Sequence, residues 1–466
     1  MHHWLDWLGF TLVLALLAGV ALTRSRQSEE YLLANRQVGL FALVATLVMT
    51  ELNTSTLLAF SALGYQAGII AIGLPLVFLV GLGWYSVTVA RRWKELNATS
   101  VAELFTARYS PALGRFASLL LMIAMLGFSA VYVKSLTLIF APLVTLSAWV
   151  LSGLLTLIVM LMTISGGLRS VIRADIMSFL ITLLLLPALL FIAVKTHGAP
   201  EALSAVFPQD QLVFDPIRQW NHPALPFHFV TSLIVLTCFT YICSPWYGQK
   251  IFAAKNPQIA WCGVAIAAML VFALYGCALL AAAYFRLERP ALADAQMVLP
   301  LMIEHWLSNG WRGIGYAVLF MAAMTTLTGV WSAMVAMVKA DFSRLALRDV
   351  YRQRLLTALF ALVSWLGANL LVEDILSRLI LANIPIAALS FALLAGFYWR
   401  RASVTGAWIS VTVGIIWGTG CFVFLGEAGG YTWYWAIYGI PLIFISGITG
   451  SLLWPNSNSI TKEHHA

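Results

Sequence analysis

Residues 39–64 read GLFALVATLVMTELNTSTLLAFSALG, an apolar stretch with a short polar run at its middle. A helix needs about 20 mainly apolar residues to cross a bilayer, and this stretch is long enough. Six of the seven residues in TELNTST (50–56) carry polar side chains. Polar groups at membrane depth are costly, so Glu51 and its neighbours indicate a functional site. We interpret the stretch as a broken membrane helix whose free carbonyls and side chains bind an ion and a solute.

The polar run also has a structural explanation. Serine and threonine hydroxyls often hydrogen-bond across packed membrane helices, so the isolated hydroxyls fit helix packing equally well. Glu51 favours the functional interpretation. An acid at the helix centre costs about 2.5–3.5 kcal/mol, which a cation, a partner charge or protonation must offset.

The composition places the whole chain in a membrane. Hydrophobic residues make up 61% and charged residues 10% of the 466 residues, whereas about 25% of an ordinary soluble domain is charged. The 18 tryptophans fit membrane interfaces. The five cysteines all fall in apolar stretches and are expected to be small buried hydrophobes. The net charge of +8 does not indicate nucleic-acid binding, because the chain has no long basic run.

Hydropathy predicts thirteen membrane-spanning helices in one polytopic domain. In the first, the positive charges follow the apolar stretch, so we expect a retained span rather than a cleaved signal peptide. The thirteen stretches are 4–23, 39–64, 67–90, 116–143, 147–166, 173–195, 228–248, 259–285, 312–338, 353–373, 377–399, 404–426 and 432–454.

Positive charges predict the orientation of these helices. With the N-terminus outside, twenty of the 27 Lys and Arg fall in inside loops, six fall in outside loops, and Lys134 lies within a span. Lys and Arg are enriched in cytoplasmic loops, so the C-terminus is predicted to be cytoplasmic. The compact chain with short tails suggests the inner (plasma) membrane of a bacterium. The inside group includes Arg24, Arg26, Lys250, Arg344, Arg348 and Lys462.

No motif indicates an enzyme. The sequence has no P-loop and no catalytic triad, and the glycine pair at 166–167 is too weak a signal for phosphate binding. We therefore expect a protein without catalytic activity and without an organic cofactor.

Two longer outside segments, 196–227 and 286–311, contain short amphipathic pieces such as 297–307, which predict surface helices or lids.

Other polar residues lie inside the predicted spans. Residues 322–329, AAMTTLTG, combine three hydroxyls with small side chains, which suits either a hard monovalent cation or close helix packing. Lys134 could pair with Glu51, bind a substrate carboxylate or snorkel outward. Asp175 could be an N-terminal helix carboxylate at the cytoplasmic interface, where the helix dipole favours it.

Two more spans carry signals for a distorted helix. Residues 240–246, TYICSPW, contain Pro245, which removes a backbone hydrogen bond, and Pro385 follows Asn383 in the eleventh span. The second and seventh spans are five apart, as expected for equivalent helices of two inverted five-helix repeats.

Five short motifs in order resemble the sodium:solute symporter family, and the likeness covers most of the chain. Each motif is modest alone, but five in family order are specific. They are EYLLANR (30–36), GYQAG (64–68), SGGLRSVIRAD (165–175), PWYGQK (245–250) with AAK (253–255), and WRR (399–401) followed by GA (406–407).

The resemblance implies an all-α leucine-transporter-type fold. Two inverted repeats, 39–195 and 228–399, would form the core, with one extra helix before it (4–23) and two after it (404–454). The resemblance also implies a sodium ion between the second and ninth spans. The implied ligands are the carbonyls of Met49, Leu52 and Ala322 and the hydroxyls of Thr325 and Thr326. A second sodium site, used by some members of the family, would involve Asp175 and Thr328.

We therefore expect sodium-coupled import of a small organic solute, such as an amino acid or a carboxylate, by alternating access. The alternatives are proton coupling through Glu51, or a membrane sensor that binds solute without moving it. The expected partners are the solute, Na⁺ and the lipid bilayer, with no nucleic acid. The candidate solute contacts are Glu51, Asn53, Thr54, Lys134, Thr240 and Asn383.

Overall fold

The computed structural model describes residues 3–21, 28–342, 350–373, 375–426 and 429–456. Five of the charges that orient the predicted spans lie outside the described residues: Arg24, Arg26, Arg344, Arg348 and Lys462.

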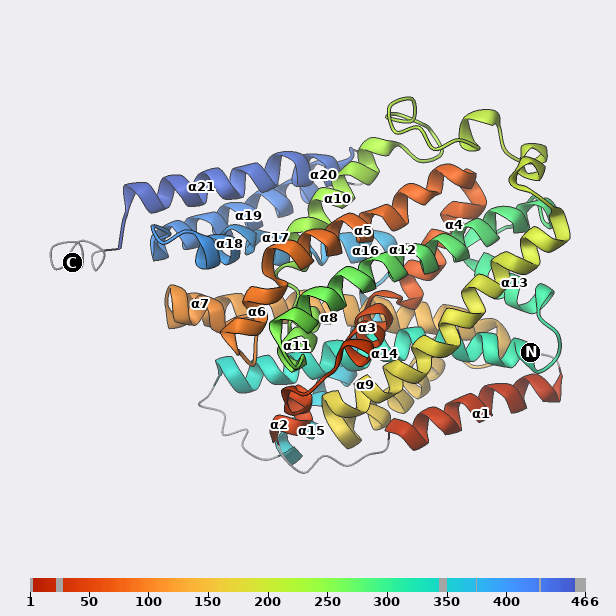
Figure 1. Ribbon diagram of the computed structural model, residues 1–466, viewed down its shortest axis with the longest axis horizontal. Coiled ribbons are helices and arrows are strands. Elements are labelled where there is room, and N and C mark those ends of the chain that lie inside the picture. Colours follow the sequence, from red (N-terminus) through yellow and green to blue (C-terminus); the bar gives the residue numbers. More distant parts are fainter. Residues whose placement is uncertain (1–2, 22–27, 343–349, 374, 427–428, 457–466) are drawn as a thin grey trace.

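The described chain is a bundle of helices, most of which run along the long axis of the molecule (Figure 1). Short 3₁₀ and π segments connect some of them. The first half contains α1 (Trp4–Ala21), α2 (Ser28–Leu33), α3 (Leu40–Glu51), α4 (Thr54–Ala67), α5 (Gly73–Tyr85), α6 (Arg91–Leu96), α7 (Glu103–Arg108), α8 (Pro111–Phe140), α9 (Ala148–His197), α10 (Phe227–Tyr241) and α11 (Pro245–Ala253). The second half contains α12 (Pro257–Glu288), α13 (Val298–Trp306), α14 (Trp311–Asp341), α15 (Val350–Leu370), α16 (Ile375–Leu381), α17 (Ile384–Ala388), α18 (Ser390–Tyr398), α19 (Val404–Leu425), α20 (Tyr431–Trp433) and α21 (Ile440–Leu453).

Among the described residues, eight helices are long and apolar enough to cross a membrane, or nine if the bent pair α10–α11 counts as one span. The chain is therefore a multi-pass membrane protein. The predicted count of thirteen is not confirmed, because helix breaks divide apolar stretches into shorter pieces. Three such shorter apolar helices are Trp4–Val20, Leu40–Glu51 and Ala148–Ile164.

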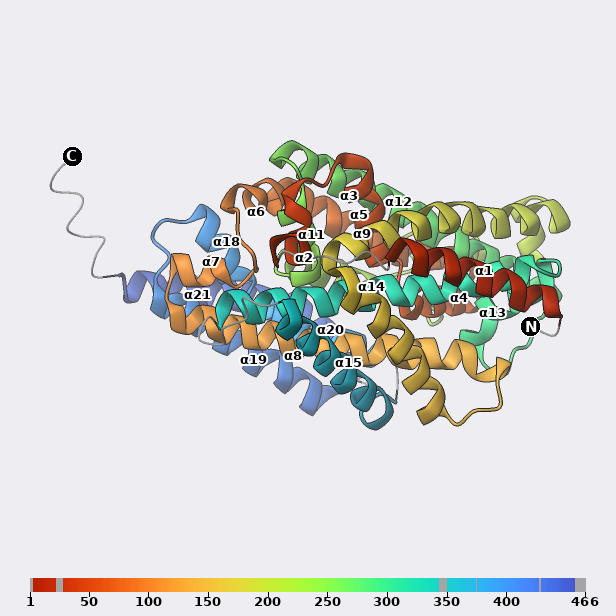
Figure 2. The same ribbon diagram turned by 90° about the horizontal axis from the view of Figure 1, so that it is seen from below.

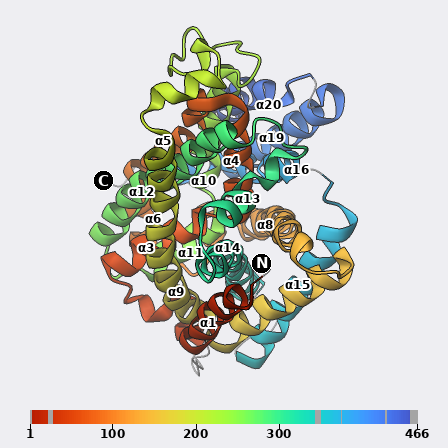
Figure 3. The same ribbon diagram turned by 90° about the vertical axis from the view of Figure 1, so that its right-hand side faces the viewer.

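Helix α14 lies inside the bundle, and the view along the long axis shows it surrounded by other helices (Figure 3). An apolar stretch of 18 residues within α14 is entirely buried inside the protein. Helices α1, α3, α8 and α9 pack against it. Small residues allow this close approach. A Cβ added to Gly313, for example, would lie 1.8 Å from the carbonyl oxygen of Asp6 on α1.

The first helix and the last long helices of the chain lie far apart. Helices α19 and α21 pack on each other and lie toward the opposite end of the molecule from α1 (Figures 1 and 2).

Between the expected fifth and sixth spans, α9 runs through a kink at Gly167, which has a φ of 59°. A Cβ there would lie 2.3 Å from the carbonyl oxygen of Tyr31, so glycine is required. Helix α13 confirms the short helix predicted at 297–307.

Candidate functional site

The helix break predicted at 50–56 is present. Helix α3 ends at Glu51, and Leu52 has non-helical dihedral angles (φ −71°, ψ 68°). Asn53 then caps α4: its side-chain oxygen accepts from the backbone N–H of Thr56 at 2.8 Å. Its amide nitrogen donates to the Glu51 carbonyl oxygen at 3.0 Å. One side chain therefore satisfies backbone groups on both sides of the break, which a buried helix end requires.

The two other predicted distortions are also present. Helices α10 and α11 meet at an angle of 50°, and Pro245 is the first residue of α11. The eleventh apolar stretch is divided into α16, α17 and α18, with Asn383 between the first two. Breaks in three helices thus place irregular backbone inside the membrane protein, where it is tolerated when it lines a cavity.

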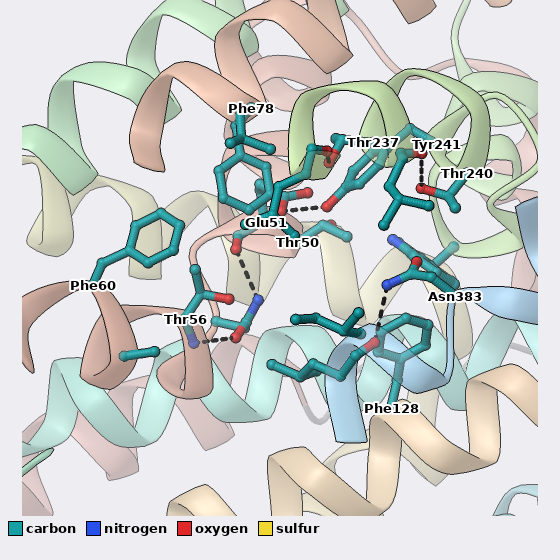
Figure 4. Close-up of a pocket in the computed structure, with 18 of the residues that line it drawn as sticks. Thr50, Glu51, Thr56, Phe60, Phe78, Phe128, Thr237, Thr240, Tyr241 and Asn383 are labelled. Atoms are coloured by element: carbon teal, nitrogen blue, oxygen red, sulfur yellow. Dashed lines mark hydrogen bonds between the residues drawn. The ribbon is translucent and has the colours of Figure 1, made fainter. Parts of the chain in front are cut away.

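A cavity of about 120 Å³ lies beside the break between α3 and α4 (Figure 4). Glu51 is 2% exposed and is the one charged side chain among the residues that line it. The hydroxyl of Tyr241 donates to its carboxylate at 2.5 Å. A carboxylate buried with one neutral donor needs either a positively charged occupant of the cavity or a proton to offset the cost of its burial.

Aromatic rings form much of the rest of the wall. They come from α4, α5, α8, α10 and α11, so helices far apart in sequence meet here. Most of these rings were not predicted, although Tyr241 and Trp246 fall within the TYICSPW motif. The rings belong to Phe60, Phe78, Phe128, Tyr132, Tyr241 and Trp246.

Four of the six predicted solute contacts line this cavity, namely Glu51, Asn53, Thr240 and Asn383. The other two lie elsewhere. The hydroxyl of Thr54 donates to the Leu319 carbonyl on α14 at 2.9 Å. Lys134 is half-buried on α8 and is not a lining residue.

A cluster of neutral oxygens lies between α3 and α14. The hydroxyl of Thr325 lies 3.0 Å from the carbonyl oxygen of Met49 and 3.3 Å from that of Ala322. The hydroxyl of Thr326 lies 3.5 Å and 3.0 Å from the same two oxygens. All four residues are at most 1% exposed. Four of the five expected sodium ligands therefore converge, and Leu52, the fifth, lies at the break itself.

The residues expected at a second sodium site have other partners. Asp175 pairs with the ammonium of Lys250 at 3.0 Å, and both side chains are fully buried. The hydroxyl of Thr328 donates to the Thr325 carbonyl at 3.0 Å. Assigning Lys250 to an inside loop was therefore wrong, because it lies within α11 and is neutralised there. The predicted span, 228–248, ended five residues before the end of α11 at Ala253.

Known proteins are similar to this chain over most of its length. Residues 31–414 match the model of the sodium:solute symporter family. The sodium/pantothenate symporter of Escherichia coli (strain K12) is 27% identical over 416 residues, covering 83% of each chain. That of Haemophilus influenzae is 23% identical over 442 residues, covering 91% of this chain and 89% of the relative.

A solved structure shows the same architecture. The substrate-bound outward-open state of a Na⁺-coupled sialic acid symporter aligns with a TM-score of 0.81 at 18% identity. The alignment covers 97% of this chain and 98% of the other. The predicted leucine-transporter-type fold class is thereby confirmed, while the limits of the two repeats stay a prediction.

Proposed function

Because this chain belongs to the sodium:solute symporter family, we propose that it imports a small organic solute together with sodium by alternating access. Sodium occupies the oxygen cluster between α3 and α14, and the solute occupies the cavity beside the break. One observation carries this proposal. The carbonyl of Met49 faces the oxygen cluster, while Glu51, two residues later on the same helix end, faces the cavity.

The oxygen cluster suits a monovalent cation. The proposed ligands are all neutral, so the ion brings the only charge, and carbonyls freed by a broken helix are common Na⁺ ligands. Such an ion joins α3 to α14 and favours the arrangement in which both helices contribute oxygens. The ligands are the carbonyls of Met49, Leu52 and Ala322 and the hydroxyls of Thr325 and Thr326.

The cavity best fits a solute that carries an ammonium group. Glu51 has no basic neighbour among the lining residues, so a solute with only a carboxylate would meet an uncompensated negative charge. Faces of aromatic rings such as those of Phe78 and Tyr241 attract cations. The volume of about 120 Å³ is small beside the roughly 300–1,000 Å³ of typical ligand pockets. An amino acid or a small amine is therefore the solute class that the site supports best.

The driving force is the descent of sodium into the cell. A membrane potential contributes about 2.3 kcal/mol per elementary charge per 100 mV. The breaks at Asn53 and before Pro245 supply hinges at which the halves of two helices can change their relative angle.

Thermal stability of the purified full-length protein, titrated with NaCl against KCl, tests the sodium site. A bound ion stabilises the folded state in proportion to the logarithm of its concentration over Kd. We expect Thr326→Ala to raise the Kd for sodium by about tenfold or more, since a hydroxyl oxygen on an ion is comparable to a hydrogen bond to a charged group, about 1.5–3 kcal/mol, and 1.4 kcal/mol is tenfold in Kd. Thr163→Ala is the matched control, because this buried hydroxyl donates to the Val159 carbonyl in its own helix.

Equal stabilisation by the two salts, or a Thr326→Ala variant that behaves as the control does, would contradict the sodium site. Uptake into proteoliposomes then separates the alternatives. Uptake that follows a pH gradient and ignores sodium would support proton coupling through Glu51. Solute binding without any uptake would support a sensor.

A further inference from the structure

A lysine ammonium lies in a ring of oxygens next to the proposed sodium site. Lys250 on α11 pairs with Asp175 on α9 at 3.0 Å, and neither side chain is exposed. The ammonium also donates to the carbonyl of Thr46 at 3.0 Å and to the hydroxyl of Thr50, both on α3. An ammonium has three N–H donors and no acceptor. Each donor of Lys250 therefore has one oxygen partner.

Thr50 links this ring of oxygens to the proposed sodium site. The hydroxyl of Thr50 accepts from Lys250, while its carbonyl accepts from the Thr326 hydroxyl at 3.3 Å. The hydroxyl of Thr46 donates to the carboxylate of Asp175. Carboxylate, carbonyl and hydroxyl oxygens are the groups that bind Na⁺ inside membrane proteins. Two cation positions, one with a neutral oxygen set and one with a carboxylate, thus lie on either side of Thr50.

Helix α14 leaves room for the ammonium. A Cβ added to Gly329 would lie 3.7 Å from the Lys250 nitrogen and 3.8 Å from its Cε carbon. Both are ordinary van der Waals distances, so the space does not require glycine, and glycine offers no oxygen ligand from its side chain. The positively charged partner of Asp175 is therefore the ammonium of Lys250, on α11.

We propose that the ammonium of Lys250 is a tethered cation that fills a second ion site on Asp175, so that this transporter binds one sodium ion. The inference rests on the proposed function, because it sets the number of coupling ions. A merely structural ion pair would also join α3, α9 and α11. The two roles differ when the ammonium is removed, because only a cation site whose occupant is lost gains affinity for sodium.

Equilibrium binding of radioactive sodium to the purified full-length protein counts the ions. We expect one ion per wild-type chain and two per Lys250→Ala chain, since truncation uncovers the oxygens of Asp175, Thr46 and Thr50. Lys250→Arg keeps a tethered cation and should bind one ion. Lys250→Ala combined with Asp175→Asn also removes the carboxylate, and its count should return to one.

Two ions on the wild-type chain would overturn the inference and leave sodium coupling intact. No sodium on the wild-type chain would instead overturn the proposed function. A folded Lys250→Ala chain that binds one ion would show that the pair is a structural contact. If this variant does not fold, Lys250→Ser, which also removes the ammonium and leaves space beside Asp175, is counted in its place: two ions support the tethered cation, and one ion shows a structural contact.

Discussion

Glu51→Gln is the most informative substitution at the cavity. The side chain is 2% exposed and accepts a hydrogen bond from Tyr241 at 2.5 Å. Glutamine keeps the shape and can still accept that bond, so the change removes the charge alone. Hydrogen bonds to charged groups contribute about 1.5–3 kcal/mol and neutral ones about 0.5–1.5 kcal/mol. With the lost Coulomb attraction, we expect an ammonium-bearing solute to bind about 2 kcal/mol more weakly, or roughly 30-fold in Kd.

The assay is a thermal-shift screen in NaCl against amines and amino acids, with acetate and pantothenate as anions. The Kd of the best ligand is then compared between the wild type and the variant. Glu103→Gln is the matched control, because this carboxylate on α7 accepts from the backbone N–H of Thr99 and does not line the cavity. We expect its Kd to equal that of the wild type.

Two results would refute this reasoning. One is an unchanged amine affinity in Glu51→Gln. The other is a wild-type protein that anions stabilise and amines do not. If amine affinity is unchanged and uptake loses its response to pH, Glu51 carries a proton rather than contacting the solute.

Further substitutions test the fold around the cavity. Asn53→Ala removes the cap of α4 and should destabilise the protein by about 1 kcal/mol. The loss should appear as a lower midpoint of thermal unfolding in detergent, and an unchanged midpoint would show that the cap is dispensable. Gly64→Ala would bring a Cβ within 2.3 Å of the Leu279 carbonyl oxygen on α12, so a loss of about 1–3 kcal/mol is expected. Gly83→Ala is its control, since nothing lies within 4 Å of the added carbon, and a similar loss there would contradict the clash.

The break between α3 and α4, beside the cavity, could be predicted from the local sequence. Lipid cannot satisfy polar groups, so a run such as TELNTST within an apolar stretch requires a local structural solution. Asn53 provides it with partners no more than three residues away. The number of spans could not be predicted in the same way. A length criterion assumes continuous helices, and α3 is only 12 residues long because the break ends it.

Lys250 shows where local sequence is insufficient. A lysine just after an apolar stretch is normally a loop residue, because an unpaired charge is costly in lipid. Here the cost is offset by Asp175, which lies 75 residues earlier in the chain. That pairing depends on how α9 and α11 pack, which the local pattern of apolar residues does not contain.

By itself the sequence determined that the chain is a multi-pass helical membrane protein, that its helices break at polar runs and prolines, and that hydroxyl side chains gather at 50–56 and 322–329. Composition and local hydrogen bonding are enough for these conclusions. The resemblance to a family supplied the expected sodium ligands. Only the tertiary structure decided which side chains face the cavity and that Lys250 meets Asp175. Membrane helices are apolar toward lipid and toward one another, so the sequence does not distinguish an aromatic ring on a cavity wall from one in the bilayer.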